Sequence, residues 1–179
     1  MISELRDKFE RYDRTRLALL DDLAVLNDDQ LRKKPSPSEW SILQIVQHMV
    51  LAERDVMQYL PEPEDLIDRK RGLRARLFYV VVLLILRWNI RVPVPSKGMV
   101  PDGNTSLSEL RQQWDENMRW FRGYVDALGP EDLQRAVFSH PIAGPLTGPQ
   151  AGTLAQYHFE AHLRQINNAK ALVMAESNG

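Results

Sequence analysis

Residues 106–130, SLSELRQQWDENMRWFRGYVDALGP, decide the fold class that we expect for this chain. Ser106 and Glu109 have the spacing of a capping box, in which the serine hydroxyl accepts a hydrogen bond from the backbone N–H of Glu109 and the carboxylate reaches back. The apolar residues that follow recur at steps of three and four: Leu107, Leu110, Trp114, Met118, Phe121, Val125 and Leu128. This period is typical of one face of an α-helix, and Gly129-Pro130 ends it. We therefore predict a long amphipathic helix that begins at Ser106.

The sequence on both sides of this segment repeats the helical period. A first helix is expected over residues 5–26, and Asn27-Asp28-Asp29 would end it. A second helix would begin between Ser38 and Ser41 and run to Leu60, and a less regular one would cover residues 66–90. The last would run from near Thr153 to about Glu176.

Proline and glycine mark the connections between these helices. Residues 34–38 cannot be helical throughout, residues 93–103 form a long linker, and residues 140–149 have the composition of a loop. The strand signal is negligible. We expect one all-α domain over residues 1–179, a helical bundle whose ligand site lies between facing helices.

The composition excludes several classes of function. The 179 residues carry a net charge of -1, which does not indicate a nucleic-acid partner. There is no cysteine, so disulfides, thiolate metal ligands and a cysteine nucleophile are excluded. The N-terminal residues 1–8 have mixed charge and no apolar core of a signal peptide. We expect a cytoplasmic protein.

The longest apolar run, residues 77–86, is too short for a bilayer span, which needs about 17–25 residues. Basic residues surround it: Arg69, Lys70, Arg71, Arg74, Arg76, Arg87 and Arg91. We expect a core or dimer-interface helix, with a funnel for an anionic substrate or a membrane-surface helix as alternatives. The membrane ranks last, because a run that is apolar all round suits burial in protein.

Three of the four histidines fit one metal site. His158 and His162 are four residues apart in the last helix, so that their side chains stack on one side of it. His48 lies on the apolar face of the second helix. If these helices are neighbours, three imidazoles can share one ion and leave a position open for water or substrate. The alternative for each is a buried neutral imidazole with a hydrogen-bond partner.

Other side chains near the histidines offer fewer possibilities. Phe159 follows His158, whereas the metalloprotease motif needs glutamate there as general base. Glu160 lies about 200° around the helix from His158 and is expected to face solvent. Glu53 and Asp55 are expected to be solvated charges, with a metal ligand or a general base as the alternative for each.

Two further side chains are candidates for a catalytic role. His140 precedes Pro141 in the loop before the last helix. It is either an exposed loop histidine or a donor or general base at the rim of a pocket. Gln165, three residues after His162, would orient a histidine or a bound water, or would be a buried amide that closes a hydrogen-bond gap.

Two motifs resemble the DinB-like family. The first is Trp40-Ser41-Ile42-Leu43-Gln44-Ile45-Val46-Gln47-His48-Met49. The second is His140-Pro141 with Gly144, followed by His158-x-x-x-His162-x-x-Gln165-Ile166. The specific motifs cover about 40 residues, whereas their order and spacing agree over the whole chain.

This resemblance implies a four-helix bundle with up-down-down-up topology, and residues 90–105 would supply its long crossover. It also implies a divalent metal, zinc or nickel, held by His48, His158 and His162. Members of the family include thiol S-transferases that use bacillithiol, mycothiol or glutathione, mycothiol-dependent isomerases, and proteins described as metal-dependent hydrolases.

The sequence is therefore compatible with three candidate functions. The first is a metal-dependent enzyme that transfers a low-molecular-weight thiol to an electrophilic small-molecule substrate. The alternatives are a metal-dependent hydrolase of an amide or ester, and a non-catalytic metal- or ligand-binding stress-response protein. We expect no nucleic-acid partner and no membrane partner, with a homodimer as one option for assembly.

Overall fold

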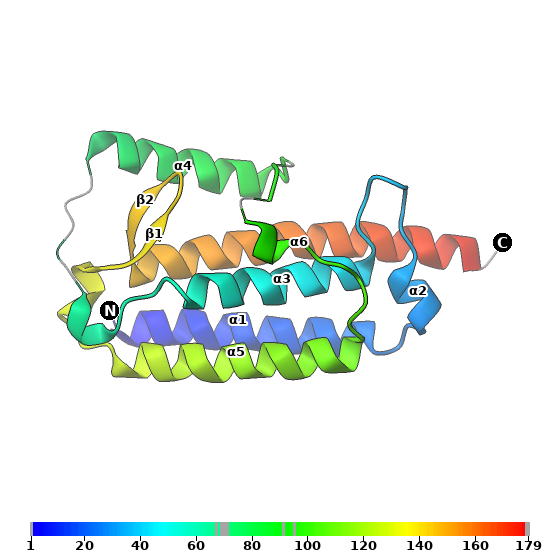
Figure 1. Cartoon of the computed structure of the whole chain (residues 1–179), viewed down its shortest axis with the longest axis horizontal. Coiled ribbons are helices and arrows are strands. Elements are labelled where there is room, and N and C mark those ends of the chain that lie inside the picture. The colour runs from blue at the N-terminus through cyan, green and yellow to red at the C-terminus, as the bar shows by residue number, and fades with distance from the viewer. Residues whose placement is uncertain (1, 67, 69–71, 91, 95, 178–179) are drawn as a thin grey trace.

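The computed structural model of this protein describes residues 2–66, 68, 72–90, 92–94 and 96–177 (Figure 1). Four long helices form a bundle: α1 (Ile2–Leu23), α3 (Ile42–Met57), α5 (Leu107–Ala127) and α6 (Gly148–Ser177). In Figure 1, α1 and α6 run in one direction, and α3 and α5 run in the other. The predicted all-α bundle and its up-down-down-up order are therefore confirmed.

Smaller elements fill the connections of the bundle. They are α2 (Asp28–Arg32), η1 (Pro63–Asp65), α4 (Leu73–Arg87), η2 (Lys97–Met99), η3 (Asp132–Gln134), β1 (Ala136–His140) and β2 (Gly144–Thr147). The crossover from α3 to α5 contains α4 and η2, so it is longer than the predicted 90–105 segment. Helix α4 lies along the outside of the bundle, where it packs against α6 and β2 (Figure 1). None of the described helices is long and apolar enough to cross a bilayer.

Local hydrogen bonds explain where the helices begin. The Ser106–Glu109 capping box is present at the start of α5, as predicted. Ser41 and Gln44 make a second capping box at the start of α3. Asn27 makes a third capping box, at the start of α2. The prediction that Asn27 ends the first helix is wrong, because α1 ends at Leu23.

The last helix also begins earlier than predicted. Helix α6 starts at Gly148, where the side chain of Gln150 accepts a hydrogen bond from the backbone N–H of Thr147. Thr153, the predicted start, lies within the first turns, and its hydroxyl donates to the carbonyl of Pro149.

The expectation of negligible strand is wrong for one short segment. Strands β1 and β2 form an antiparallel hairpin, in which Phe138 pairs with Leu146 and His140 pairs with Gly144. Gly144 has a φ of 69°, a left-handed conformation that glycine adopts without steric cost. The hairpin lies between α4 and α6, and its Leu146 is fully buried.

The core of the bundle contains a half-buried carboxylate that was expected to be solvated. Glu53 of α3 accepts hydrogen bonds from the hydroxyl of Tyr12, from the indole of Trp114 at 2.9 Å and from the amide of Asn117 at 3.4 Å. Burial raises the pKa of Glu53 to about 7, and these three donors oppose that rise. The prediction failed because the donors come from two other helices.

Candidate metal centre

The three histidines of the predicted site lie together. Helices α3 and α6 are neighbours, so that His48 faces His158 and His162, which are one turn apart on α6. One ligand nitrogen of each residue lies within 4.8 Å of those of the other two. The Nε2 atoms of His158 and His162 are 3.1 Å apart. Two imidazoles on one tetrahedral zinc ion, with Zn–N bonds of about 2.0–2.1 Å, would have their nitrogens about 3.3 Å apart.

The imidazole rings of His48 and His162 are each held in orientation by a hydrogen bond at Nδ1. The Nδ1–H of His48 donates to the carbonyl of Met99, at 2.8 Å. The Nδ1–H of His162 donates to Oε1 of Gln165, at 2.9 Å, and Nε2 of Gln165 donates to Oδ1 of Asn89, at 2.9 Å. In this arrangement the Nε2 lone pairs of both rings face the cluster. Metal-ligating histidines in proteins have the same second layer of partners.

Burial keeps these imidazoles neutral. It lowers the pKa of His48, although the Met99 carbonyl opposes this effect. It lowers the pKa of His162 to about 4, and the charge of His48 adds to the effect. The pKa of His158 is lowered well below its ordinary value, first by burial and then by the charges of His162, His48 and His140. Because only a neutral imidazole can bind a metal ion, all three are ready to act as ligands at pH 7.

The first family motif has a structural role beside the cluster. The ring of Trp40 packs against that of His48, with centroids 4.9 Å apart. Ser41 caps α3, and the same helix then places His48 two turns further along. The motif therefore fixes both the start of the helix and the surroundings of its histidine.

His140 ends β1 and is half-buried. Its Nδ1 accepts hydrogen bonds from the backbone N–H groups of Ile142, at 3.1 Å, and Ala143, at 3.0 Å. Burial lowers its pKa, so the ring is neutral at pH 7 and carries its proton on Nε2. It lies close enough to His158 for its charge to affect the pKa of that residue. This tautomer suits a hydrogen-bond donor and does not suit a general base at Nε2.

The other carboxylates considered from the sequence have partners of their own. Glu160 accepts a hydrogen bond from Gln156 at 3.0 Å, and Asp55 accepts one from Ser96 at 3.2 Å. Asp55 is thus half-buried beside the crossover and is not the solvated charge that we expected. Neither residue belongs to the group of described side chains that can share a metal ion.

Two parts of the site were missed by sequence reasoning. The carbonyl of Met99 is a backbone group, so no side-chain pattern could reveal it. Asn89 follows the end of α4 with a φ of 53°. Asparagine is tolerated in this left-handed conformation. The sequence did not indicate it, because Asn89 lies within the helix predicted over residues 66–90.

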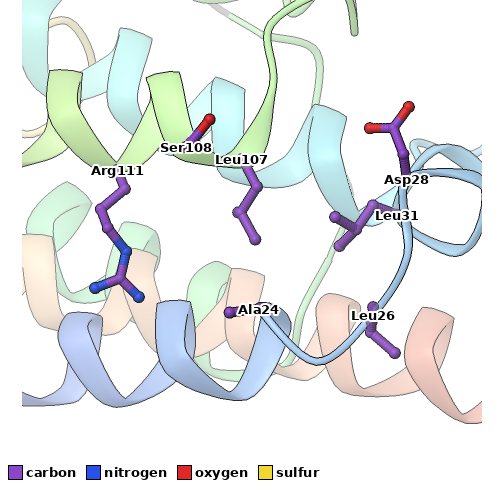
Figure 2. A pocket seen from close by; sticks show the side chains of 7 residues that line it. All are labelled: Ala24, Leu26, Asp28, Leu31, Leu107, Ser108 and Arg111. Carbon is purple, nitrogen blue, oxygen red and sulfur yellow. The ribbon is translucent and has the colours of Figure 1, made fainter.

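A surface hollow elsewhere on the molecule does not involve the histidines. It lies between the end of α1, α2 and the start of α5 (Figure 2). The residues that line it are Ala24, Leu26, Asp28, Leu31, Leu107, Ser108 and Arg111. It has mainly apolar walls and no group of metal ligands, so the histidine cluster remains the candidate centre.

Comparisons with known proteins agree with this geometry. Residues 11–166 match the DinB superfamily, a segment that includes all four histidines. The chain is also 24% identical over 160 residues to the uncharacterized protein YuaE of Bacillus subtilis (strain 168), which covers 89% of this chain and 94% of that protein. No solved structure matches the chain significantly.

Proposed function

Because the chain belongs to the DinB superfamily, we propose that it is a metal-dependent enzyme that transfers a low-molecular-weight thiol to an electrophilic small molecule. His48, His158 and His162 hold one divalent ion, zinc or nickel. The observation that carries the proposal is the convergence of three neutral imidazoles on one point, with hydrogen bonds at Nδ1 that make Nε2 the lone-pair nitrogen of His48 and of His162.

The chemistry of the donor set supports an open site. Three imidazoles are the protein ligands of known catalytic zinc centres, in which a fourth position is left for water or substrate. An ion held there would act as a Lewis acid that favours the anionic form of a bound thiol or water. The chain contains no cysteine, so a sulfur nucleophile must come from a small molecule.

The side chains considered as general bases favour thiol transfer over hydrolysis. Hydrolysis commonly uses a general base that takes a proton from the attacking water. Glu53, Asp55 and Glu160 are hydrogen-bonded to other side chains, and His140 carries its proton on Nε2. A thiol, with an ordinary pKa near 8.5, needs less assistance to ionise than water does.

In this proposal His140 and Gln165 have different tasks. Gln165 keeps the His162 ring in the tautomer that binds metal, through the 2.9 Å contact with Nδ1. His140 offers an Nε2–H donor near His158, where it can hold the substrate or its leaving group. The thiol sulfur forms a bond to the electrophilic carbon while the leaving group departs with the bonding electrons, and the thiol proton goes to solvent.

Metal content tests the first half of the proposal. Untagged protein is loaded with zinc or nickel, desalted and analysed for bound metal. We expect about one ion per chain in the wild type and in His140→Ala, and a large loss in His158→Ala/His162→Ala. Equal metal content in all three proteins would refute the ligand assignment.

Thiol consumption tests the second half. Metal-loaded protein is mixed with a chloronitrobenzene and with glutathione, bacillithiol or mycothiol, and free thiol is measured over time. We expect loss of thiol that requires the metal-loaded wild type and is absent in His48→Ala. Turnover of a generic ester without any thiol would support the hydrolase instead. Ligand-dependent stabilisation without turnover would support a binding protein.

A further inference from the structure

Helix α4 has an apolar face that the bundle leaves exposed. Leu73 is 85% exposed, Leu77 is 64% exposed and Trp88, directly after the helix, is 65% exposed. Val80 and Val81 are also exposed, and in the sequence they lie between Leu77 and Trp88. At about 100° per residue, these five positions fall within about 100° of one another around the helix axis, so they share one side of the helix. We call these five residues the α4 apolar face.

The opposite side of the same helix attaches it to the protein. Val82 is buried on the hairpin, and the hydroxyl of Tyr79 donates to the carbonyl of Gln150 in α6. At about 100° per residue, Leu73 lies about 180° around the helix from Val82. Arg164 of α6 donates to the carbonyls of Leu86 and Arg87 at the C-terminal end of α4, at 2.7 and 3.2 Å. The helix is therefore folded and fixed while its outer face stays free.

Arginine side chains border the α4 apolar face on both sides. On the same helical projection, Arg74 lies on one side of the stripe and Arg76 and Arg87 lie on the other. All three residues are exposed. An apolar stripe between two basic borders is typical of a helix that lies in the plane of a membrane interface.

The charge distribution of the whole chain identifies the occupant. Residues 69–101 contain eight basic residues and no acidic residue, although the net charge of the protein is only -1. The rest of the chain is therefore net acidic, and positive charge is concentrated in the segment of the sequence that contains α4. A second copy placed against this face by a twofold axis would bring arginines against arginines, and α4 has no carboxylate to pair with them. A surface of anionic lipid has the complementary charge.

We propose that α4 docks the protein on the surface of an anionic membrane. The α4 apolar face enters the boundary between headgroups and acyl chains, and Arg74, Arg76 and Arg87 contact the lipid phosphates. This proposal reverses the sequence-based expectation of no membrane partner. That expectation assumed that residues 77–86 are buried in protein, whereas Leu77, Val80 and Val81 are exposed.

Vesicle binding tests the proposal with the full-length chain. Protein is sedimented with vesicles of phosphatidylcholine alone, or of equal parts phosphatidylcholine and phosphatidylglycerol, at 50 and 500 mM salt. We expect binding to the anionic vesicles, which falls sharply at the higher salt because the attraction is screened. Absence of binding to anionic vesicles, or equal binding to both compositions, would overturn the proposal.

Matched variants separate the α4 apolar face from general charge. Arg74→Gln/Arg76→Gln/Arg87→Gln should lower the partition coefficient on the order of 100-fold, at roughly 1 kcal/mol for each basic residue near an anionic surface. Arg11→Gln/Arg14→Gln/Arg119→Gln removes the same charge from exposed positions of α1 and α5 and should lower it much less. Equal losses in the two triple variants would overturn the proposal, because bulk charge would then explain the binding.

The apolar contribution has its own pair of variants. Leu77→Gln/Trp88→Gln should weaken binding by about tenfold for each side chain. Val25→Gln/Leu172→Gln, at positions that are 77% and 52% exposed, should have little effect. Brominated acyl chains should quench the fluorescence of Trp88, and Trp88→Phe should lose most of this quenching. A concentration-dependent dimer that Leu77→Gln/Trp88→Gln abolishes, without vesicle binding, would assign the face to a second copy instead.

Discussion

Replacement of Glu53 by glutamine should remove a pH dependence of stability that this carboxylate creates. Glu53 is half-buried among the side chains of Tyr12, Trp114 and Asn117, and desolvation there raises its pKa from 4.5 to about 7. The charge of Arg16 also lowers the pKa of Glu53, but by less than the three donors do. The folded protein therefore binds a proton more tightly than the unfolded chain does.

The sign of the effect follows from this difference in proton binding. Between pH 4.5 and 7 the folded state holds more protons on Glu53 than the unfolded state, so the free energy of unfolding falls as pH rises. A shift of this size corresponds to about 3 kcal/mol, at 1.36 kcal/mol per pKa unit. This stabilising contribution is fully present well below pH 4.5 and is lost completely above pH 7.

Urea unfolding at pH 5 and pH 8 measures this contribution. Other ionisable groups act equally in both proteins, so the difference between wild type and Glu53→Gln isolates the one carboxyl group. From pH 5 to pH 8, we expect the free energy of unfolding of the wild type to fall by about 2–3 kcal/mol relative to that of the variant. The control Glu10→Gln, on an exposed residue of α1, should follow the wild type. A Glu53→Gln difference that stays constant from pH 5 to pH 8 would refute the assigned burial.

Three further predictions concern the metal centre. Gln165→Ala should weaken metal binding about 10- to 100-fold in a competition with a chelator, as loss of a ligand's hydrogen-bond partner typically does, whereas Gln156→Ala on the same helix should not. Asn89→Gly keeps the left-handed backbone but removes the partner of Gln165, so we expect a smaller loss in the same assay; no loss would mean that Gln165 holds its position unaided. Chelation should lower the melting temperature by about 10 °C while circular dichroism retains the helical signal, and a coil spectrum would show that the ion is required for folding.

Local features of this fold could be predicted from the sequence, because they depend on residues near one another in the chain. The capping box of Ser106 and Glu109 marked the start of α5 correctly. The hairpin of β1 and β2 was missed because strands of five and four residues are too short for an alternating pattern, and Pro145 suggests a loop. Tertiary packing on α4 and α6 stabilises this hairpin.

The metal ligands of the candidate site could be predicted from the sequence, whereas the side chains around them could not. The spacing of His158 and His162 and the apolar position of His48 were visible in the sequence. The burial of Glu53 was not, because its partners Tyr12 and Trp114 are 41 and 61 residues away. A carboxylate on a helix is normally exposed, and only the assembled bundle brings these donors to it.

The topology explains why the crossover matters to the histidines. Helices α3 and α5 run in the same direction, so the chain must return along the length of the bundle between them (Figure 1). This return places Met99 against His48 and Asn89 against Gln165, which in turn contacts His162. A bundle with short connections could carry the same three histidines, but it would have no backbone carbonyl or amide at these positions. The long crossover thus orients two of the three imidazoles, and the same segment presents the exposed face of α4.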